Sequence, residues 1–306
     1  MVRWSADGLV AVTGASGRLG SRLAFRLAAE GARQRLVVRD PRHEPRLADG
    51  RRLPECEVVI ADGYDDTAGM RAAFDGVRTV FLVSARESVD RVDLHAATID
   101  AAVAAGVERL VYTSFTGAAP DAVFTFARDH WHTEQHLARA GERSGLRWTV
   151  LRDNLYHHAL TTFVGDDGVI RGPAGTGRVA SVSHDDVADV ATAVILDERP
   201  QRHDAATYEV SGPQALTLAE VAQTLTTATG RRITYHAETE EEAYASRATS
   251  GAEPFELAGW VTSYTAIAAG QLAHVSADVG RLVGRPARSL AQWLDDYPAE
   301  WAHLRR

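Results

Sequence analysis

The sequence predicts an α/β protein with a doubly wound parallel sheet and a smaller, partly interleaved α+β lobe in its C-terminal half. Two features of the 306 residues carry this prediction. Short apolar runs alternate with helical segments up to residue 152, which is typical of parallel strands joined by crossover helices. Beyond that point the alternation loosens and turn residues become frequent, which indicates a separate lobe.

The first half supplies the expected strands and helices of the sheet. A short, continuous apolar run predicts a strand buried on both faces, and apolar residues three and four positions apart predict a helix with one buried face. The expected strands cover residues 9–13, 35–39, 57–62, 79–84, 109–114 and 147–152. The expected helices cover residues 19–29, 67–74, 91–105 and 129–144.

The second half carries weaker signals. Residues 165–177 are rich in Gly and Asp and predict a loop or a short hairpin with little core of its own. Ser183 followed by Asp186, and Thr217 followed by Glu220, are typical of capping boxes that open helices. Since no low-complexity linker separates the halves, we expect an interleaved division. The expected first domain covers residues 1–152 and is rejoined by 183–205, and the expected lobe covers residues 153–182 and 206–306.

The composition excludes several classes of protein. With 45% hydrophobic and 24% charged residues, the chain is expected to fold as an ordinary globular protein. A net charge of −8 argues against a nucleic-acid partner, and no apolar run approaches the roughly 20 residues of a membrane helix. The N-terminus shows no signal-peptide pattern, so we expect a cytoplasmic protein without a membrane partner. Cys56 is the only cysteine, which excludes an intrachain disulfide, and we assign it no role.

A glycine-rich segment stands where the first strand should turn into the first helix. Gly14, Gly17 and Gly20 follow a G-x-x-G-x-x-G spacing. Glycine accepts a tight turn with positive φ, lets the backbone approach a pyrophosphate and leaves bare N–H groups at the helix terminus. In this context the pattern predicts a nicotinamide dinucleotide on a Rossmann sheet. The expected cofactor contacts are Gly14, Ser16, Gly17, Arg18, Leu19, Gly20, Arg39, Asp62, Val83 and Ser84.

The end of the second strand favours NADP(H) over NAD(H). Arg39 closes this strand, and a guanidinium suits the 2′-phosphate of NADP(H). Arg18, inside the glycine loop, offers a second positive contact. The alternative is that Arg39 is a solvated strand end and that Asp40 binds the ribose, which gives NAD(H). Asp62, which closes the third strand, either binds the adenine amino group or caps the following turn.

Several stretches of the chain match a known family in order and spacing. They are residues 12–20, 38–41, 111–114, His130 with Glu134, 149–154, 172–183 and 208–235, with 282–290 in the tail. Through them the chain resembles the NmrA-like branch of the short-chain dehydrogenase/reductase superfamily, and within it the NADPH-dependent type 2 quinone oxidoreductases. The resemblance implies a smaller C-terminal lobe that closes over the nicotinamide, with residues 154–156 and 172–177 lining the cleft.

The resemblance also bears on the mechanism. Most short-chain dehydrogenases use Tyr-x-x-x-Lys, whereas His130 and Glu134 stand at the corresponding positions here and the chain contains no Lys. Reduction of a ketone creates a strongly basic alkoxide that needs a positioned acid. Reduction of a quinone yields a phenolate, whose conjugate acid has a pKa of about 10. This weakly basic product needs little assistance from a general acid. The missing Lys therefore favours a quinone as the acceptor.

Two residues are candidate catalytic groups. His130 is expected to donate a proton or a hydrogen bond to the quinone oxygen, because imidazole titrates near neutral pH. The alternative is a helix histidine that only packs or caps. Ser114 ends the fifth strand, at the edge where ligands bind in such sheets, and either orients the substrate or nicotinamide or is a satisfied strand-end hydroxyl.

Candidate substrate contacts follow the sixth strand. Tyr156 and His157 are assigned to the substrate, because an aromatic and polar cluster suits a flat ring. Asn154 is assigned to it because the resemblance implies that residues 154–156 line the cleft. Tyr156, His157 and the neighbouring His158 are explained nearly as well as core or surface residues. His132 and His136 share a helix face, but no third ligand accompanies them, so we expect no metal site.

Together these features predict an NADPH-dependent reductase that delivers hydride to a quinone or a related electron-poor aromatic carbonyl, without flavin or metal. One alternative is a tailoring oxidoreductase of secondary metabolism that acts on a polycyclic aromatic polyketide. Another is a non-catalytic NADP(H) sensor. The expected partner is a small aromatic or quinone substrate, and the oligomeric state, including a homodimer, stays open.

Overall fold

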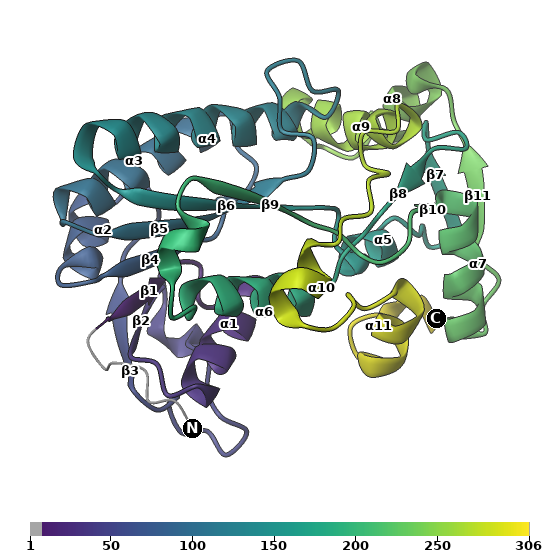
Figure 1. Ribbon diagram of the computed structural model, residues 1–306. Helices are drawn as coiled ribbons and strands as arrows, with labels where there is room; N and C mark the ends of the chain where they lie inside the picture. Colours follow the sequence, from purple (N-terminus) through teal and green to yellow (C-terminus); the bar gives the residue numbers. More distant parts are fainter. Residues whose placement is uncertain (1–7, 306) are drawn as a thin grey trace. The chain divides into compact units, whose positions relative to one another are not determined.

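A computed structural model of the chain describes residues 8–305, and its centre is a seven-stranded sheet with the order β3-β2-β1-β4-β5-β6-β9 (Figure 1). The pairs β1–β2, β2–β3, β1–β4 and β4–β5 are parallel. This architecture confirms the doubly wound Rossmann sheet. The strands are β1 (Val10–Val12), β2 (Gln34–Val38), β3 (Cys56–Ile60), β4 (Thr79–Leu82), β5 (Arg109–Phe115), β6 (Arg147–Asp153) and β9 (Ala206–Val210).

The crossover helices agree with the sequence pattern except at one end. Helix α4 begins at Thr125 instead of residue 129, because the side chain of the distant Thr262 accepts a hydrogen bond from the Thr125 N–H at 3.2 Å. A helix start that is satisfied by a remote side chain leaves no local signal. The helices between the strands are α1 (Arg18–Ala29), α2 (Thr67–Phe74), α3 (Arg91–Ala104), α4 (Thr125–Ser144) and α6 (His184–Ile195).

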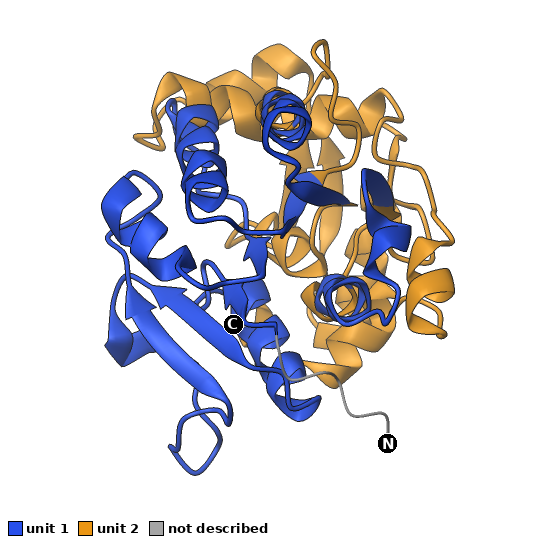
Figure 2. Cartoon of the chain, turned by 60° about the vertical axis from the view of Figure 1, so that its left-hand side comes forward, with its two compact units in different colours: residues 1–114, 131–151, 187–208 blue, residues 115–130, 152–186, 209–306 orange. Residues whose placement is uncertain are grey.

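The chain divides into two compact units, shown in separate colours in Figure 2. Unit 1 contains residues 1–114, 131–151 and 187–208, and unit 2 contains residues 115–130, 152–186 and 209–306. Residues 115–130 group with unit 2, whereas the boundaries expected from the sequence kept them in the first domain. The reason is apolar packing, because Phe115, Phe124 and Phe126 belong to the hydrophobic core of unit 2.

Unit 2 contains more regular structure than the sequence indicated. Residues 165–177 were expected to be a loop or hairpin, but residues 169–172 form a strand that pairs in parallel with residues 234–237. The partner lies far along the chain, so no local pattern reveals the pair. The remaining strands are β7 (Val169–Gly172), β8 (Arg178–Val179), β10 (Leu216–Thr217) and β11 (Thr234–Ala237). The α-helices are α5 (His157–Thr162), α7 (Leu218–Thr229), α8 (Glu240–Arg247), α9 (Pro254–Ala268), α10 (Asp278–Val283) and α11 (Leu290–Asp296), with short 3-10 helices at Pro41–His43, Pro200–His203 and Ala302–Arg305.

Both expected helix caps are present. Thr217 and Glu220 form a reciprocal capping box at the start of α7. At α6 the Ser183 hydroxyl accepts a hydrogen bond from the Asp186 N–H at 2.9 Å, which satisfies one of the helix's unpaired donors. Within residues 8–305, no helix has the length and apolar character needed to cross a bilayer.

The glycine turn after β1 depends on a close backbone approach. Gly14 has φ of 56°, in the left-handed region that glycine adopts without strain. A Cβ atom added to Gly20 would lie 2.3 Å from the carbonyl oxygen of Gly14 and 2.9 Å from the Cα of Ala15. Helix α1 therefore packs directly on the backbone of the turn, and only glycine fits at position 20.

We expect Gly20→Ala to lower the free energy of unfolding by about 1–3 kcal/mol, because backbone atoms must move to admit the methyl group. Urea denaturation measures this change. Ser21→Ala is the matched control, since its neighbouring position on α1 already carries a Cβ, and its expected effect is within about 0.5 kcal/mol. Equal stability of Gly20→Ala and Ser21→Ala would contradict the packing argument.

Candidate functional site

A cavity of about 460 Å³ in unit 1 lies at the carboxyl ends of β1 to β4. Its volume is within the range of small-molecule and cofactor sites, roughly 300–1,000 Å³. The strand order reverses between β1 and β4, and ligands bind at this switch point in doubly wound sheets. The predicted residues that line the cavity are Gly14, Ser16, Gly17, Arg39, Asp62, Val83 and Ser84. The cavity is also lined by residues that the sequence pattern did not indicate as cofactor contacts, namely Val37, Val38, Ala61, Gly63, Tyr64, Asp65, Met70, Ala85, Arg86, Ser88 and Leu94.

The three other predicted cofactor contacts lie outside the lining. Leu19 is 5% exposed and belongs to the core, and Gly20 packs on the turn as described above. Arg18 is exposed at the first position of α1. Their direct contact with a cofactor stays a prediction.

Arg39 and Asp40 differ sharply in their surroundings. The Asp40 carboxylate accepts hydrogen bonds from the Arg42 N–H at 2.9 Å and from its guanidinium at 2.7 Å, and these bonds hold the Asp40 pKa below its ordinary value. Asp40 does not line the cavity, whereas Arg39 lines it and is exposed. Among residues 8–305 the Arg39 side chain has no hydrogen bond or ion pair. The end of β2 therefore offers the cavity a cation and no anion.

Asp62 lines the cavity, and the capping role considered for it belongs to Asp66. The Asp66 carboxylate accepts hydrogen bonds from the Gly69 N–H at 2.9 Å and from the Asp62 N–H at 3.1 Å. Asp66 is thus the N-cap of α2, and the turn after β3 is fixed without the Asp62 side chain. The proposed contact of Asp62 with an adenine amino group stays a prediction.

Tyr64, which lines the cavity, links the residues that follow β1, β3 and β4 by hydrogen bonds. Its hydroxyl lies 2.8 Å from Thr13 Oγ1 and donates to the Val83 carbonyl at 2.5 Å, while the Val83 N–H donates to Thr13 Oγ1 at 3.0 Å. Burial raises the pKa of Tyr64 to about 12, so the phenol stays protonated and keeps its role as a donor. This network fixes the strand ends from which the lining residues project.

The start of α1 fits an anionic group. Gly17 is the N-cap residue, and no side chain caps the helix. The first N–H groups of a helix need partners, and a phosphate supplies them. On the other side of the lining, Ser88 carries a buried hydroxyl without a hydrogen-bond partner among the described residues. A ligand rich in phosphate and hydroxyl oxygens would satisfy both features, which is the chemistry of a dinucleotide.

Ser114 is buried next to a carboxylate. Its hydroxyl donates a hydrogen bond to Glu134 Oε1 at 2.5 Å, and the two residues are only 1% and 8% exposed. Glu134 is the residue at the position that Lys usually occupies. The carboxylate holds the Ser114 proton in place, and Ser114 does not line the cavity of unit 1. A catalytic role of Ser114 stays a prediction.

His130 lies in unit 2, on the first part of α4. It is 5% exposed, and its ring stacks on Phe115 with centroids 6.2 Å apart and an interplanar angle of 30°. This stacking holds the imidazole plane against an aromatic core. The role of His130 as a proton donor stays a prediction.

Tyr156 is held on two sides within unit 2. Its hydroxyl donates to Asp153 Oδ2, and its ring stacks on His184 at 3.7 Å between centroids and 8° between planes. Burial, followed by the Asp153 charge, raises the pKa of Tyr156 well above its ordinary value. One ring face is therefore covered by His184.

Asn154 and His157 have their polar atoms engaged inside unit 2. The Asn154 amide donates to the Leu272 carbonyl at 3.0 Å and accepts from the Leu155 N–H at 2.8 Å. His157 Nε2 lies 3.1 Å from the Arg288 carbonyl oxygen, and Nδ1 lies 2.9 Å from Ser181 Oγ. These contacts indicate structural positions, and direct substrate contacts by the two residues stay predictions.

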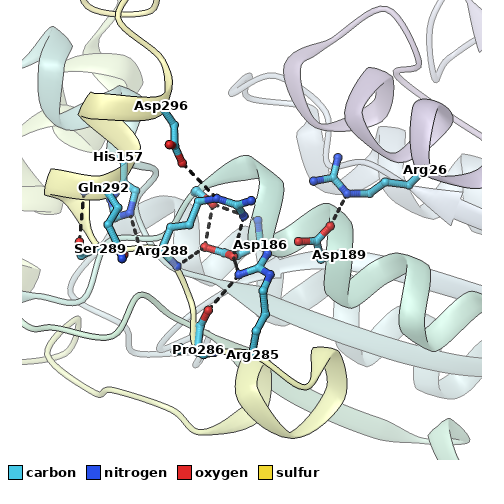
Figure 3. Close-up of polar contacts among 11 residues, drawn as sticks. Arg26, His157, Asp186, Asp189, Arg285, Pro286, Arg288, Ser289, Gln292 and Asp296 are labelled. Atoms are coloured by element: carbon cyan, nitrogen blue, oxygen red, sulfur yellow. Dashed lines mark hydrogen bonds and ion pairs between the residues drawn. The ribbon is translucent and has the colours of Figure 1, made fainter. Parts of the chain in front are cut away.

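Asp186 anchors the segment that contains Arg288, whose carbonyl oxygen contacts His157, as Figure 3 shows. The Asp186 carboxylate is fully buried and accepts from Arg285 Nη1 at 2.8 Å and from the Arg288 N–H at 2.8 Å. The Ser183 hydroxyl donates to the same carboxylate at 2.7 Å. Within the described residues, no group of three or more His, Cys, Asp or Glu side chains is arranged to hold a metal ion.

The chain is similar to known reductases over nearly its whole length. The model of the NmrA-like family matches residues 6–264. Quinone oxidoreductase 2 of Escherichia coli (strain K12) is 32% identical over 290 residues, covering 93% of this chain and 96% of that protein. The NAD(P)H azoreductase of Xenophilus azovorans is 31% identical, covering 95% and 98%. The crystal structure of the NADPH-dependent quinone oxidoreductase of Escherichia coli complexed with NADPH matches with a TM-score of 0.80 and 30% identity, over 94% of this chain and 99% of that chain.

The buried state of His157 predicts acid sensitivity. Burial lowers its pKa from 6.5 to about 4, so between these values the unfolded chain binds more protons than the folded chain. Stability is therefore lost as pH falls from 6.5 toward 4, at up to about 1.4 kcal/mol per pH unit from this group. We expect His157→Gln to make the pH dependence of the free energy of unfolding shallower by about this amount. Buried His95, with a pKa near 3, contributes in the same direction in both proteins.

Urea denaturation at pH 7, 6 and 5 measures the two slopes. His132→Gln is the control, because His132 is exposed on α4. A His157→Gln slope equal to that of the wild type and the control would show that His157 is not the group responsible.

Proposed function

Because the chain belongs to the NmrA-like family, we propose that it is an NADPH-dependent reductase that delivers hydride to a quinone or a related electron-poor aromatic carbonyl, without flavin or metal. The observation that carries this proposal is the contrast at the end of β2. Arg39 faces the cavity without a partner among the described residues, while Asp40 is neutralised by Arg42 outside it. A guanidinium in this position makes charge-assisted hydrogen bonds to a 2′-phosphate, whereas the ribose 2′-hydroxyl of NAD(H) is usually bound by an acidic residue.

The remaining lining residues suit the rest of the cofactor. The uncapped start of α1 at Gly17 would hold the diphosphate, and Gly14 leaves space for its backbone approach. Asp62, which has no capping duty, would bind the adenine amino group. Bound NADPH supplies the hydride from its nicotinamide ring, and the protein's task is to hold it and the acceptor in register.

The choice of acceptor follows from the residues that are absent and from the relatives. The chain contains no Lys, so the usual Tyr-x-x-x-Lys acid cannot operate. Relatives that are 32% and 31% identical carry the names quinone oxidoreductase and azoreductase. Quinones and azo compounds are both conjugated, electron-poor acceptors. A quinone fits best, since its reduced form is a phenolate with a conjugate-acid pKa of about 10.

His130 is the proposed proton or hydrogen-bond donor to the acceptor. Its stacking on Phe115 fixes the ring plane, which favours a donor with a set direction. An acceptor whose reduced form is more basic needs this donor more. Reduction of an azo bond leaves charge on a nitrogen far more basic than a phenolate, so the contribution of His130 should be larger there.

The proposal is tested by following NADPH oxidation at 340 nm with menadione, 1,4-benzoquinone and a soluble azo dye. We expect turnover with both quinones, and we expect His130→Gln to lower kcat for a quinone by about threefold and for the azo dye by about tenfold or more. His132→Gln, on the same helix, is the control and should leave both rates unchanged. Equal losses with both acceptors, or none, would remove the donor role from His130.

The same assay separates the two alternative functions. Tight NADPH binding without turnover on any acceptor would contradict the proposed reductase and favour a sensor. Turnover restricted to polycyclic aromatic quinones or ketones would favour a tailoring enzyme of secondary metabolism.

Arg39 supplies a prediction about cofactor choice. We expect Arg39→Gln to raise the Kd of NADPH by about tenfold or more and to leave the Kd of NADH within about twofold of the wild type, because the charge-assisted bonds go to the 2′-phosphate alone. Calorimetric titration with the two dinucleotides measures this difference. If NADPH and NADH lose affinity equally, Arg39 does not read the 2′-phosphate.

A further inference from the structure

We propose that Arg86 is a further cationic contact of the dinucleotide and that it binds the diphosphate from the loop that follows β4. This inference rests on the proposed function and extends it to a residue that the glycine motif does not include. Arg86 lines the same cavity as Arg39. It is exposed, and within residues 8–305 its side chain has no hydrogen bond or ion pair.

The sheet order separates the two arginines. β1 lies between β2 and β4, and the glycine turn follows β1. Arg39 follows β2 and Arg86 follows β4, so the two side chains come from the strands that flank the turn. The adenosine half of a dinucleotide belongs to the β2 side in this fold, and the diphosphate crosses the turn. Arg86 is therefore the cation on the diphosphate side of the cavity.

The charges of the lining agree with this assignment. Its acidic residues, Asp62 and Asp65, both follow β3, at the edge of the sheet beyond β2. The lining residues that follow β4 include no acid. A guanidinium that forms no ion pair with another described residue favours an anionic ligand, and a diphosphate matches its planar set of donors.

The backbone next to Arg86 is held in place by buried groups. The Ala85 N–H donates to His95 Nε2 at 2.7 Å, and Arg91 Nε donates to the Ala85 carbonyl at 3.0 Å. His95 and Arg91 are 0% and 3% exposed. Burial, and next the Arg91 charge, lowers the pKa of His95 to about 3, so its ring stays neutral and keeps accepting this bond. Arg86 thus projects from a fixed position, which reduces the entropy lost on binding.

A second feature of the same loop points to a ligand. Ser88 is one of the residues that line the cavity. Its hydroxyl is buried and has no hydrogen-bond partner among the described residues. Buried hydroxyls in proteins are normally satisfied. A ribose or phosphate oxygen of a ligand in this cavity would supply the missing partner.

The test compares Arg86→Gln with Arg39→Gln on ligands that differ in their phosphates. NADP⁺ carries the 2′-phosphate and the diphosphate, NAD⁺ carries the diphosphate alone, and adenosine 2′-monophosphate carries the 2′-phosphate alone. We expect Arg86→Gln to raise the Kd of NADP⁺ and NAD⁺ by the same factor, about tenfold, and to leave adenosine 2′-monophosphate unchanged. Arg39→Gln should show the opposite pattern, with losses for NADP⁺ and adenosine 2′-monophosphate.

Two further variants serve as controls in these calorimetric titrations. Arg71→Gln removes one exposed charge from α2 outside the cavity lining and should change no Kd by more than about twofold. Arg86→Lys should recover part of the lost affinity, because it restores the charge without the forked donors. Circular dichroism and thermal melting should be unchanged for Arg86→Gln, since the substitution removes no hydrogen bond or ion pair among the described residues.

Two results would overturn the assignment. If Arg86→Gln leaves NADP⁺ and NAD⁺ affinities unchanged, Arg86 does not touch the cofactor. If it weakens NADP⁺ and adenosine 2′-monophosphate but not NAD⁺, Arg86 binds the 2′-phosphate instead of the diphosphate. Failure of the wild-type protein to bind either dinucleotide would refute the proposed function itself, and that result is distinct from both.

Discussion

The direct packing of helix α1 on the backbone of the glycine turn is the constraint on which the cavity depends. The Gly20 Cα faces the Gly14 carbonyl oxygen at a distance that admits no side chain, and Gly14 adopts a positive φ to make the turn. This approach brings the uncapped start of α1 to the carboxyl end of β1. The N–H groups at that start are therefore presented to the cavity, and the lining residues of β2, β3 and β4 are arranged around them.

Around this turn, pairing decides which charges are available. Three acids accept hydrogen bonds from nearby groups. Asp40 accepts from Arg42, Asp66 accepts from the first turn of α2, and Glu134 accepts from Ser114. Arg39 and Arg86 line the cavity without such bonds in the described chain. In a chain with a net charge of −8, the residues that follow β2 and β4 thus give the lining two cations, whereas its acids, Asp62 and Asp65, both follow β3.

The sequence alone predicted the parts of the molecule whose signals are local. The apolar runs of β1 to β6, the glycine spacing and Arg39 at the end of β2 all belong to short segments. The missed features depend on distant partners: β7 needs β11, the start of α4 needs Thr262, and Tyr64 is fixed by Thr13 and Val83. Arg86 was within reach, since it lies two positions after the predicted Ser84, but a lone exposed arginine has no distinguishing pattern. The roles of Asn154, Tyr156 and His157 depend on packing that spacing cannot show.

The discontinuous course of the chain has a consequence for how such proteins change over evolution. The backbone leaves unit 1 after Ser114, Leu151 and Tyr208 and returns to it after His130 and Asp186. No single crossover in a gene can therefore exchange one unit for another and leave both cores intact. Exchange of a whole unit would need several crossovers at matched positions, whereas a point substitution or a short insertion within one segment leaves both cores in place.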